Sequence, residues 1–160
     1  MPFPCGDRHM KIGVISDTHA QSVSDIPQAV LDTLAKVDLI VHAGDFTEMR
    51  VLEGLQSLGE VKAVHGNTDS PALRQALPAQ QIFVAGGKRI GLTHGSGSRL
   101  DIVPRIRLDF IDVDIIIFGH SHEPYNRIIK GTLLFNPGPA MYSFGLLTIG
   151  DEVNSEIILM

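Results

Sequence analysis

The sequence predicts an α/β domain that begins with parallel strands and ends in β-structure, and two features of its patterning support this. Short apolar, β-branched segments alternate with apolar residues at helical spacing through the first two thirds of the chain. From Tyr125 onward the pattern changes to strands and turns. Because a strand–helix–strand rhythm favours parallel strands joined by helical crossovers, we expect such a sheet in the first part of the chain.

The first part of the chain is expected to contain three short buried strands, at residues 11–16, 39–42 and 61–65. Apolar residues at helical spacing predict a helix in each interval: Val30, Leu31, Leu34 and Val37 in the first, and Met49, Leu52, Leu55 and Leu58 in the second. Asp25 and Gln28 have the spacing of a capping box at the start of the first helix.

The second part of the chain is expected to begin with a hairpin, in which residues 81–85 and 89–93 pair across a two-glycine turn. A following helix, capped by Asp101, has its apolar positions at Ile102, Val103, Ile106 and Phe110. Further strands are predicted at residues 114–118, 125–129, 133–135, 144–149 and 153–159.

The composition of the chain narrows its class of function. A chain of 160 residues with 44% hydrophobic and 19% charged residues predicts a soluble protein with one domain, expected at residues 11–160 after a disordered or loosely ordered leader at residues 1–10. The net charge of −5 argues against nucleic acid as a partner. No apolar stretch approaches the roughly 20 residues that span a bilayer, so no membrane partner is expected. The single cysteine, Cys5, fits a reducing, cytoplasmic location.

Polar side chains follow five of the predicted strands, at the point where each strand ends. In chain order these motifs are Asp17-Thr18-His19, Gly44-Asp45, Gly66-Asn67-Thr68-Asp69, His94-Gly95 and Gly119-His120-Ser121-His122. In open α/β sheets, ligands bind beyond the carboxyl ends of the strands, so we expect these side chains to share one rim. Each motif alone is weak, since Gly-Asp occurs at three places in the chain, and the prediction depends on the five together.

The residue types in these motifs are those of a metal site. Carboxylate, amide oxygen and imidazole without thiolate suit Mn²⁺, Fe²⁺, Ni²⁺ or Zn²⁺. Seven ligands suffice for two ions when one carboxylate bridges them, and two such ions can clamp the attacking and leaving oxygens at phosphorus. The predicted ligands are Asp17, His19, Asp45, Asn67, His94, His120 and His122.

Each of these residues also has a simpler structural interpretation. Asp17 and Asp45 could cap helices, and Asn67 could be a turn residue. A lone His94 would more often be a core histidine than a ligand. The segment 119–122 is harder to explain in this way, because two histidines two residues apart point to the same side of an extended chain. The metal interpretation therefore accounts better for the whole set.

Several other polar residues receive separate expectations. His42 and His65 precede the motifs within their strands, so structural roles are expected for both. Asp69 is expected to orient its loop through hydrogen bonds. The arginines divide into candidate phosphate contacts, Arg74 and Arg99, and the solvated face of a helix, Arg105 and Arg107.

Taken together and in this order, the five motifs resemble those of the calcineurin-like metallophosphoesterases, and in particular the small capless bacterial and archaeal phosphodiesterases. The likeness extends from Lys11 to the C-terminus and includes the turn Asn136-Pro137-Gly138. It implies a four-layer α-β-β-α sandwich, in which two mixed β-sheets are flanked by helices and the metal site lies at the C-terminal ends of the strands.

The resemblance also implies how the ligands divide between two divalent metal ions. Asp17, His19 and His122 would bind one ion, Asn67, His94 and His120 the other, and Asp45 would bridge them. In this scheme Asp45, Asn67 and His94 act in catalysis, and a hydroxide that bridges the ions attacks phosphorus. Mn²⁺ is expected before Fe²⁺, Ni²⁺ or Zn²⁺. The substrate would be a small-molecule phosphate ester, and a homodimer is an expectation from the family alone.

The sequence departs from the family pattern at Thr68, where many members carry a histidine that acts as a general acid. A hydroxyl is a poor proton donor at neutral pH, and general acid help is worth about 10²–10⁴-fold. This favours a phosphodiesterase, with Thr68 and Arg99 as substrate contacts. The alternative is a non-catalytic protein-binding scaffold, since the retromer subunit of this fold binds partner proteins and has lost part of its metal chemistry.

Overall fold

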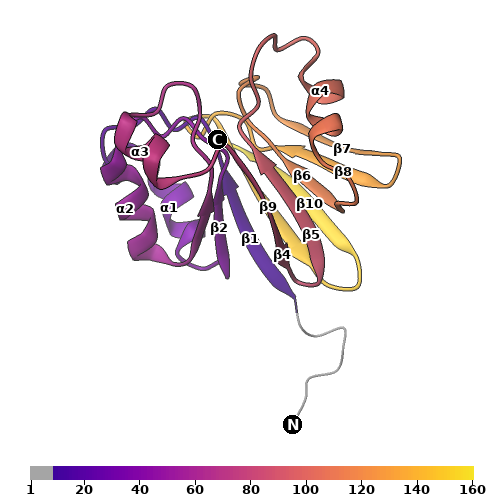
Figure 1. Ribbon diagram of the computed structural model, residues 1–160. Coiled ribbons are helices and arrows are strands. Elements are labelled where there is room, and N and C mark those ends of the chain that lie inside the picture. The colour runs from indigo at the N-terminus through magenta and orange to yellow at the C-terminus, as the bar shows by residue number, and fades with distance from the viewer. Residues whose placement is uncertain (1–8) are drawn as a thin grey trace.

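The computed structural model describes residues 9–160, which form two five-stranded β-sheets packed face to face (Figure 1). The strands of the first sheet are, in spatial order, β10 (Val153–Leu159), β9 (Ser143–Ile149), β1 (Met10–Ile15), β2 (Leu39–His42) and β3 (Val61–Ala63). Those of the second are β4 (Gln80–Ala85), β5 (Lys88–Thr93), β6 (Ile115–Ile117), β8 (Thr132–Asn136) and β7 (Tyr125–Ile129). Both sheets contain parallel and antiparallel pairs and are therefore mixed.

The space between the sheets is filled by an apolar cluster to which both contribute. Val14 and Val41 of the first sheet and Leu92 and Ile117 of the second are completely buried in it. Ile15, the neighbour of Val14 in β1, belongs instead to a cluster on the outer face of the first sheet. Because successive strand residues point to opposite faces, a strand that is apolar throughout supplies both layers.

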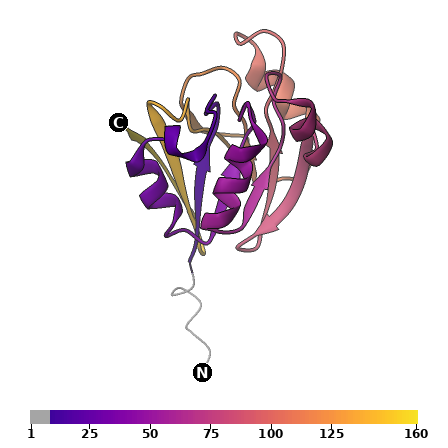
Figure 2. The same ribbon diagram turned by 90° about the vertical axis from the view of Figure 1, so that its left-hand side faces the viewer.

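Helices cover both outer faces of the pair of sheets (Figures 1 and 2). These helices are α1 (Gln28–Leu34), α2 (Met49–Leu58), α3 (Pro71–Ala76) and α4 (Ile102–Asp109). The first three pack on the first sheet through a cluster that includes Val30, Leu55 and Leu73. The fourth packs on the second sheet, where Ile106 and Phe118 share a cluster. The predicted four-layer α-β-β-α sandwich is confirmed.

The parallel strands bring five loops together at one end of the molecule. In the first sheet β1, β2 and β3 are parallel neighbours, and in the second β5, β6 and β8 are. Backbone hydrogen bonds tie the loops that follow these strands, since Asp17 N donates to Gly44 O at 3.0 Å and Gly119 N donates to His94 O at 3.2 Å. All five motifs lie in these loops.

The predicted start of the first helix was wrong in detail. A short 3₁₀ turn, η2 (Val23–Asp25), precedes α1, and α1 begins after Pro27. Asp25 does not cap α1, because its Oδ2 accepts from the backbone N of Gln21 at 3.1 Å and of Ser22 at 3.4 Å. The helix also ends at Leu34, before the predicted Val37.

Two further differences concern the later helices. Asp101 precedes α4 but makes no capping bond, because its carboxylate accepts from Arg105 Nε at 3.1 Å. The helix α3 was not predicted, although Ser70 caps it by accepting from Leu73 N and Pro71 occupies its first turn. A serine–proline pair of this kind is a typical helix start.

The predicted leader at residues 1–10 lies almost entirely outside the described residues, and the first strand begins at Met10, one residue before the predicted Lys11. Along the part of the chain that the structure describes, each helix is too short or too polar to cross a membrane.

Candidate metal centre

The five motifs follow strand ends in tight turns that place several site residues in an unusual backbone conformation. Five of the predicted ligands have a positive φ, which is 53° for Asp17, 45° for His19, 64° for Asp45, 69° for His120 and 62° for His122. Such residues are disfavoured by on the order of 1–3 kcal/mol each, and they concentrate at functional sites. The fold therefore tolerates local strain in order to turn these side chains toward one another.

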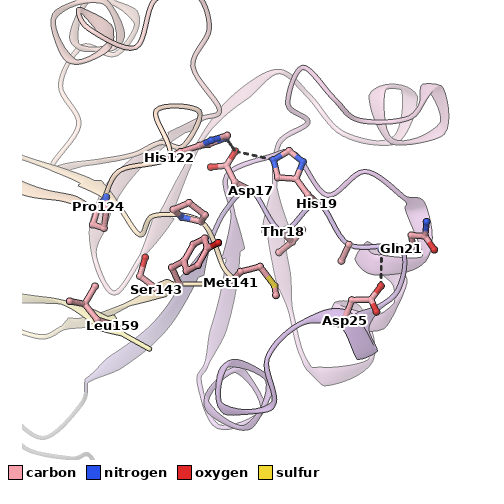
Figure 3. A pocket seen from close by; sticks show the side chains of 13 residues that line it. Asp17, Thr18, His19, Gln21, Asp25, His122, Pro124, Met141, Ser143 and Leu159 are labelled. Atoms are coloured by element: carbon pink, nitrogen blue, oxygen red, sulfur yellow. Dashed lines mark hydrogen bonds and ion pairs between the residues drawn. The ribbon is translucent and has the colours of Figure 1, made fainter.

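Asp17, His19, Asp45 and His122 form a candidate metal-binding group, because one donor atom from each lies within 4.8 Å of the others. Asp17 Oδ2 accepts from Ser16 Oγ at 2.9 Å, but Oδ1 is buried and has no hydrogen-bond partner among the described residues. His122 Nε2 lies 3.4 Å from this oxygen and His19 Nε2 lies 4.0 Å from it (Figure 3). A buried carboxylate oxygen facing imidazole nitrogens fits a divalent cation.

Asn67 and His94 extend this group on the other side of Asp45. His94 Nδ1 lies 2.8 Å from Ala43 O and donates to it, so Nε2 is the nitrogen that can bind a metal once it has lost its proton. This Nε2 is 3.2 Å from Asp45 Oδ2 and 3.0 Å from Asn67 Oδ1. Ligands about 2.1 Å from one ion, at right or tetrahedral angles, lie about 3.0–3.4 Å apart. Both distances from His94 Nε2 have the spacing of neighbouring ligands.

The pKa values of Asp45 and His94 are coupled. Burial opposes ionisation of Asp45, but hydrogen bonds from His94 and from the N–H of Thr68 outweigh it and hold the pKa of that carboxyl well below its usual range. Burial also lowers the pKa of His94, yet Asp45 and Asp17 outweigh it and raise that pKa above its ordinary value. Asp45 is therefore a carboxylate, and a proton on His94 Nε2 competes with a metal ion for the same lone pair.

His120 is oriented by the loop that follows β5. Its Nε2 lies 2.9 Å from Gly97 O and donates to it, so Nδ1 is the nitrogen suited to a metal. Arg105 fixes the same loop by donating to the carbonyl oxygens of Ser96 and Ser98. Arg105 lies on a partly exposed face of α4, as expected, but its guanidinium also supports the loop that orients His120, which was not predicted.

Asp69 forms hydrogen bonds within its own loop, as predicted, and also ties that loop to the one that carries Asp45. Its buried carboxylate accepts hydrogen bonds from the backbone N of Gly66 at 2.7 Å, Asp45 at 3.0 Å and Thr47 at 2.7 Å. A Cβ at Gly66 would collide with Asp45 Oδ1, so glycine is needed there. The same Oδ1 accepts from Thr68 N at 2.9 Å. These contacts leave Asp45 Oδ2 as the oxygen that faces the histidines.

The two histidines with predicted structural roles, His42 and His65, differ in burial and in surroundings. His42 is fully buried in β2, accepts from Gly44 N at 3.0 Å through Nδ1, and stacks on Phe46 with 3.5 Å between ring centroids. Burial lowers the pKa of His42 well below its usual value, so the ring is neutral. His65 lies beyond the end of β3, where it is partly exposed and lines a cavity of about 330 Å³ next to Asn67.

The two candidate phosphate contacts have different surroundings. Arg74, on α3, donates to the carbonyl oxygens of Asn67 at 2.7 Å and Asp69 at 3.1 Å, so it supports the loop between them. Arg99 lies at the rim of the site, with Nη2 3.5 Å from His122 Nδ1. Of the two, Arg99 is the one that lies beside the candidate metal group.

Asn136 is a positioning residue that sequence reasoning missed. At the end of β8 it donates through Nδ2 to Gly119 O at 3.2 Å and to Ser121 Oγ at 3.0 Å. Its Oδ1 accepts from Gly138 N at 2.9 Å. Asn136 thereby holds the loop 119–122, which carries two of the predicted ligands. The Asn-Pro-Gly turn and the strand before the loop 119–122 were both predicted, but the pairing that brings them side by side was not.

A family model for the calcineurin-like phosphoesterase superfamily domain matches residues 10–149, and the chain therefore belongs to this superfamily of metal-dependent phosphoester hydrolases. A probable metallophosphoesterase of Methanocaldococcus jannaschii is 35% identical over 161 residues, covering 93% of this chain and 81% of the relative. A phosphodiesterase of the same organism is 28% identical over 156 residues, covering 88% of this chain and 91% of the relative.

Solved structures share this fold over almost their whole length. Vps29 from Entamoeba histolytica, in a crystal structure with Zn²⁺, has a TM-score of 0.73 and 28% identity, covering 94% of this chain and 99% of that chain. An archaeal phosphodiesterase has a TM-score of 0.76 at 22% identity, covering 93% of this chain and 100% of that chain. The second similarity bears on the fold alone.

The substitution Asp69→Asn is expected to weaken metal binding about 10–100-fold, because the support of ligand residues is worth about that much. Asparagine keeps one acceptor oxygen and loses the second, so the N–H groups of Gly66, Asp45 and Thr47 can no longer all be satisfied. Titration of the metal-free protein with Zn²⁺, followed by calorimetry, measures the affinity. Asp151→Asn, at an exposed turn, is the control, and equal affinities of the two variants would contradict the role of Asp69.

Proposed function

We propose that the protein is a phosphodiesterase whose site holds two divalent metal ions bridged by Asp45. The observation that carries the proposal is the position of Asp45 Oδ2, which lies 3.8 Å from His19 Nε2 and 3.2 Å from His94 Nε2. One carboxylate oxygen thus lies near a donor atom from each of the two predicted ligand sets. Since one carboxylate can bridge two ions, this position suits Asp45 as the shared ligand.

The imidazole rings support the same division of ligands. His19 and His122 are one edge-to-face pair, with centroids 5.8 Å apart, on the side of Asp17. His94 and His120 form a second such pair at 5.2 Å. Each pair can serve one ion, with Asp17 completing the first set and Asn67 the second.

The proposed reaction is hydrolysis of a phosphate ester. When bound, two divalent ions would supply a hydroxide nucleophile and neutralise charge on the phosphoryl oxygens, and Mn²⁺ is the first candidate, with Fe²⁺, Ni²⁺ and Zn²⁺ as alternatives. Asp45 would keep the two ligand sets at a fixed distance from each other. Asn67 and His94 belong to the second ligand set. Arg99, at the rim, would bind a non-bridging phosphoryl oxygen.

Thr68 supports a diester in preference to a monoester. Its side chain is exposed at the rim of the site, and its backbone N–H is already used by Asp45 Oδ1 at 2.9 Å. A monoester with a poor leaving group needs a proton as the bond breaks, which a threonine hydroxyl supplies poorly. A diester with an acidic leaving group needs little protonation. The phosphodiesterase among the relatives agrees with this assignment.

The second candidate function is the non-catalytic protein-binding scaffold, and the similarity to Vps29 is the observation in its favour. A scaffold does not need a complete set of metal donors. This chain has donor side chains at all seven predicted positions, and the second group keeps ligand-like spacing around Asp45. The enzyme is therefore the better-supported of the two.

Removal of metal is expected to abolish hydrolysis of a nitrophenyl phosphodiester, and Mn²⁺ or another transition ion is expected to restore it, because the donor set consists of oxygen and nitrogen. Asp45→Asn should then lose more activity than Asp17→Asn, since the charge of Asp45 would serve both ions. Turnover and metal content are measured on the same samples. Full activity in excess chelator, with no metal left, would rule the mechanism out.

The wild type is expected to have a higher kcat/KM for a nitrophenyl diester than for the matching monoester. Thr68→His should raise monoester hydrolysis by up to about 10²-fold, because an imidazole there can protonate the leaving group. Steady-state kinetics at saturating Mn²⁺ give kcat/KM for the diester and for the monoester, in the wild type and in Thr68→His.

Thr68→Asn is the matched control, because it offers no acid and should leave the preference for diesters unchanged. A wild type that strongly prefers the monoester would contradict the role given to Thr68. The acid would then have to come from elsewhere, and loss of monoester activity in His65→Ala would identify it, since His65 lines the adjoining cavity.

A further inference from the structure

An apolar pocket of about 720 Å³ adjoins the candidate metal group on the side of Asp17, His19 and His122 (Figure 3). Three loops and the end of β10 contribute to its apolar wall, which consists of Ala20, Pro124, Pro139, Met141, Tyr142 and Leu159. Ligand pockets in proteins are typically about 300–1,000 Å³ and mostly apolar, with few polar groups at one end. This pocket has that form, with the metal ligands as its polar end.

Large apolar side chains of this wall are open to solvent. Tyr142 is 71% exposed, Leu159 is 74% exposed and Met141 is 52% exposed. Single exposed apolar residues are ordinary, but a group gathered beside a candidate active site marks a binding surface. One polar residue that lines the pocket, Ser143, already has a hydrogen-bond partner, because its Oγ donates to Pro137 O at 2.6 Å.

The charges around the pocket restrict what can bind. Among the described residues that line it there is no lysine or arginine, and Asp25 adds a negative charge. The cavity of about 330 Å³ on the side of Asn67 differs, because Arg74 and Arg105 line it. A second phosphate or a carboxylate would therefore be repelled from the apolar pocket, whereas an uncharged ring would bury apolar surface there.

We propose that this pocket binds an uncharged aromatic ring carried by one alcohol of the diester, with Tyr142 as its main contact. Offset or edge-to-face packing of such a ring on Tyr142 would orient the ester toward Asp17 and His122. The inference rests on the proposed function for the position of the phosphate. It adds the substrate class, which is a diester of an aromatic alcohol without further anionic groups.

The test compares phenylphosphonate with methylphosphonate on the Zn²⁺-loaded full chain, because the two probes share one metal-binding group and differ in the ring. Calorimetry should give about ten-fold tighter binding of phenylphosphonate, from burial of the ring. Tyr142→Ala should weaken phenylphosphonate about 3- to 10-fold and leave methylphosphonate unchanged. Leu108→Ala, an exposed apolar residue on α4 outside the pocket, should change neither.

A spectroscopic readout locates the ring directly. The chain has two tyrosines, so phenylphosphonate should shift the ring resonances of Tyr142 and not those of Tyr125. Leu159→Ala is a second variant, and it too should weaken binding of phenylphosphonate without changing that of methylphosphonate. Equal affinities for the two phosphonates, binding of neither, or equal weakening of both by Tyr142→Ala would overturn the inference. Failure to hydrolyse nitrophenyl diesters, measured separately, would contradict the proposed function instead.

Discussion

Two carboxylates are buried at the site, and among the described residues neither has a lysine or arginine within ion-pair distance. Asp17 is 1% exposed and Asp45 is 2% exposed, and among the described residues their partners within ion-pair distance are histidines. Burying uncompensated charge costs several kcal/mol per ion. A lysine or arginine would compensate it but would fill the space between the ligands. Imidazole and amide donors leave that space to a cation that the side chains themselves do not provide.

The strained backbone of the loops follows from the same constraint. Five of the predicted ligands have positive φ, and each lies in a loop that follows a buried strand. The strain is sustained because hydrogen bonds over-determine each loop, with Asp69 joining two loops and Asn136 and Arg105 holding two others. These hydrogen bonds hold the loops that carry the predicted ligands. The side chain of Tyr142, in the apolar wall of the pocket, is not held by them.

The sequence predicted the strands well and placed the five motifs in loops at their ends, because both depend on local patterns. A buried strand followed by Asp, Asn or His is visible in one dimension, and parallel pairing then brings the ends together. Residues that act through distant contacts were missed. Arg105 has the spacing of a solvated helix position, and only the fold shows that the loop carrying Gly97 lies against it. The apolar pocket was missed for the same reason, since its wall comes from separate segments.

Electron paramagnetic resonance of the Mn²⁺-loaded protein can decide whether Asp45 bridges two ions, because it detects whether the ions share a bridging ligand. A site bridged by Asp45 should bind two Mn²⁺ per chain and give the spectrum of an exchange-coupled pair. That coupling should be lost in Asp45→Asn and retained in Asp151→Asn. One Mn²⁺ per chain with the spectrum of an isolated ion, or a coupled pair that survives Asp45→Asn unchanged, would contradict it.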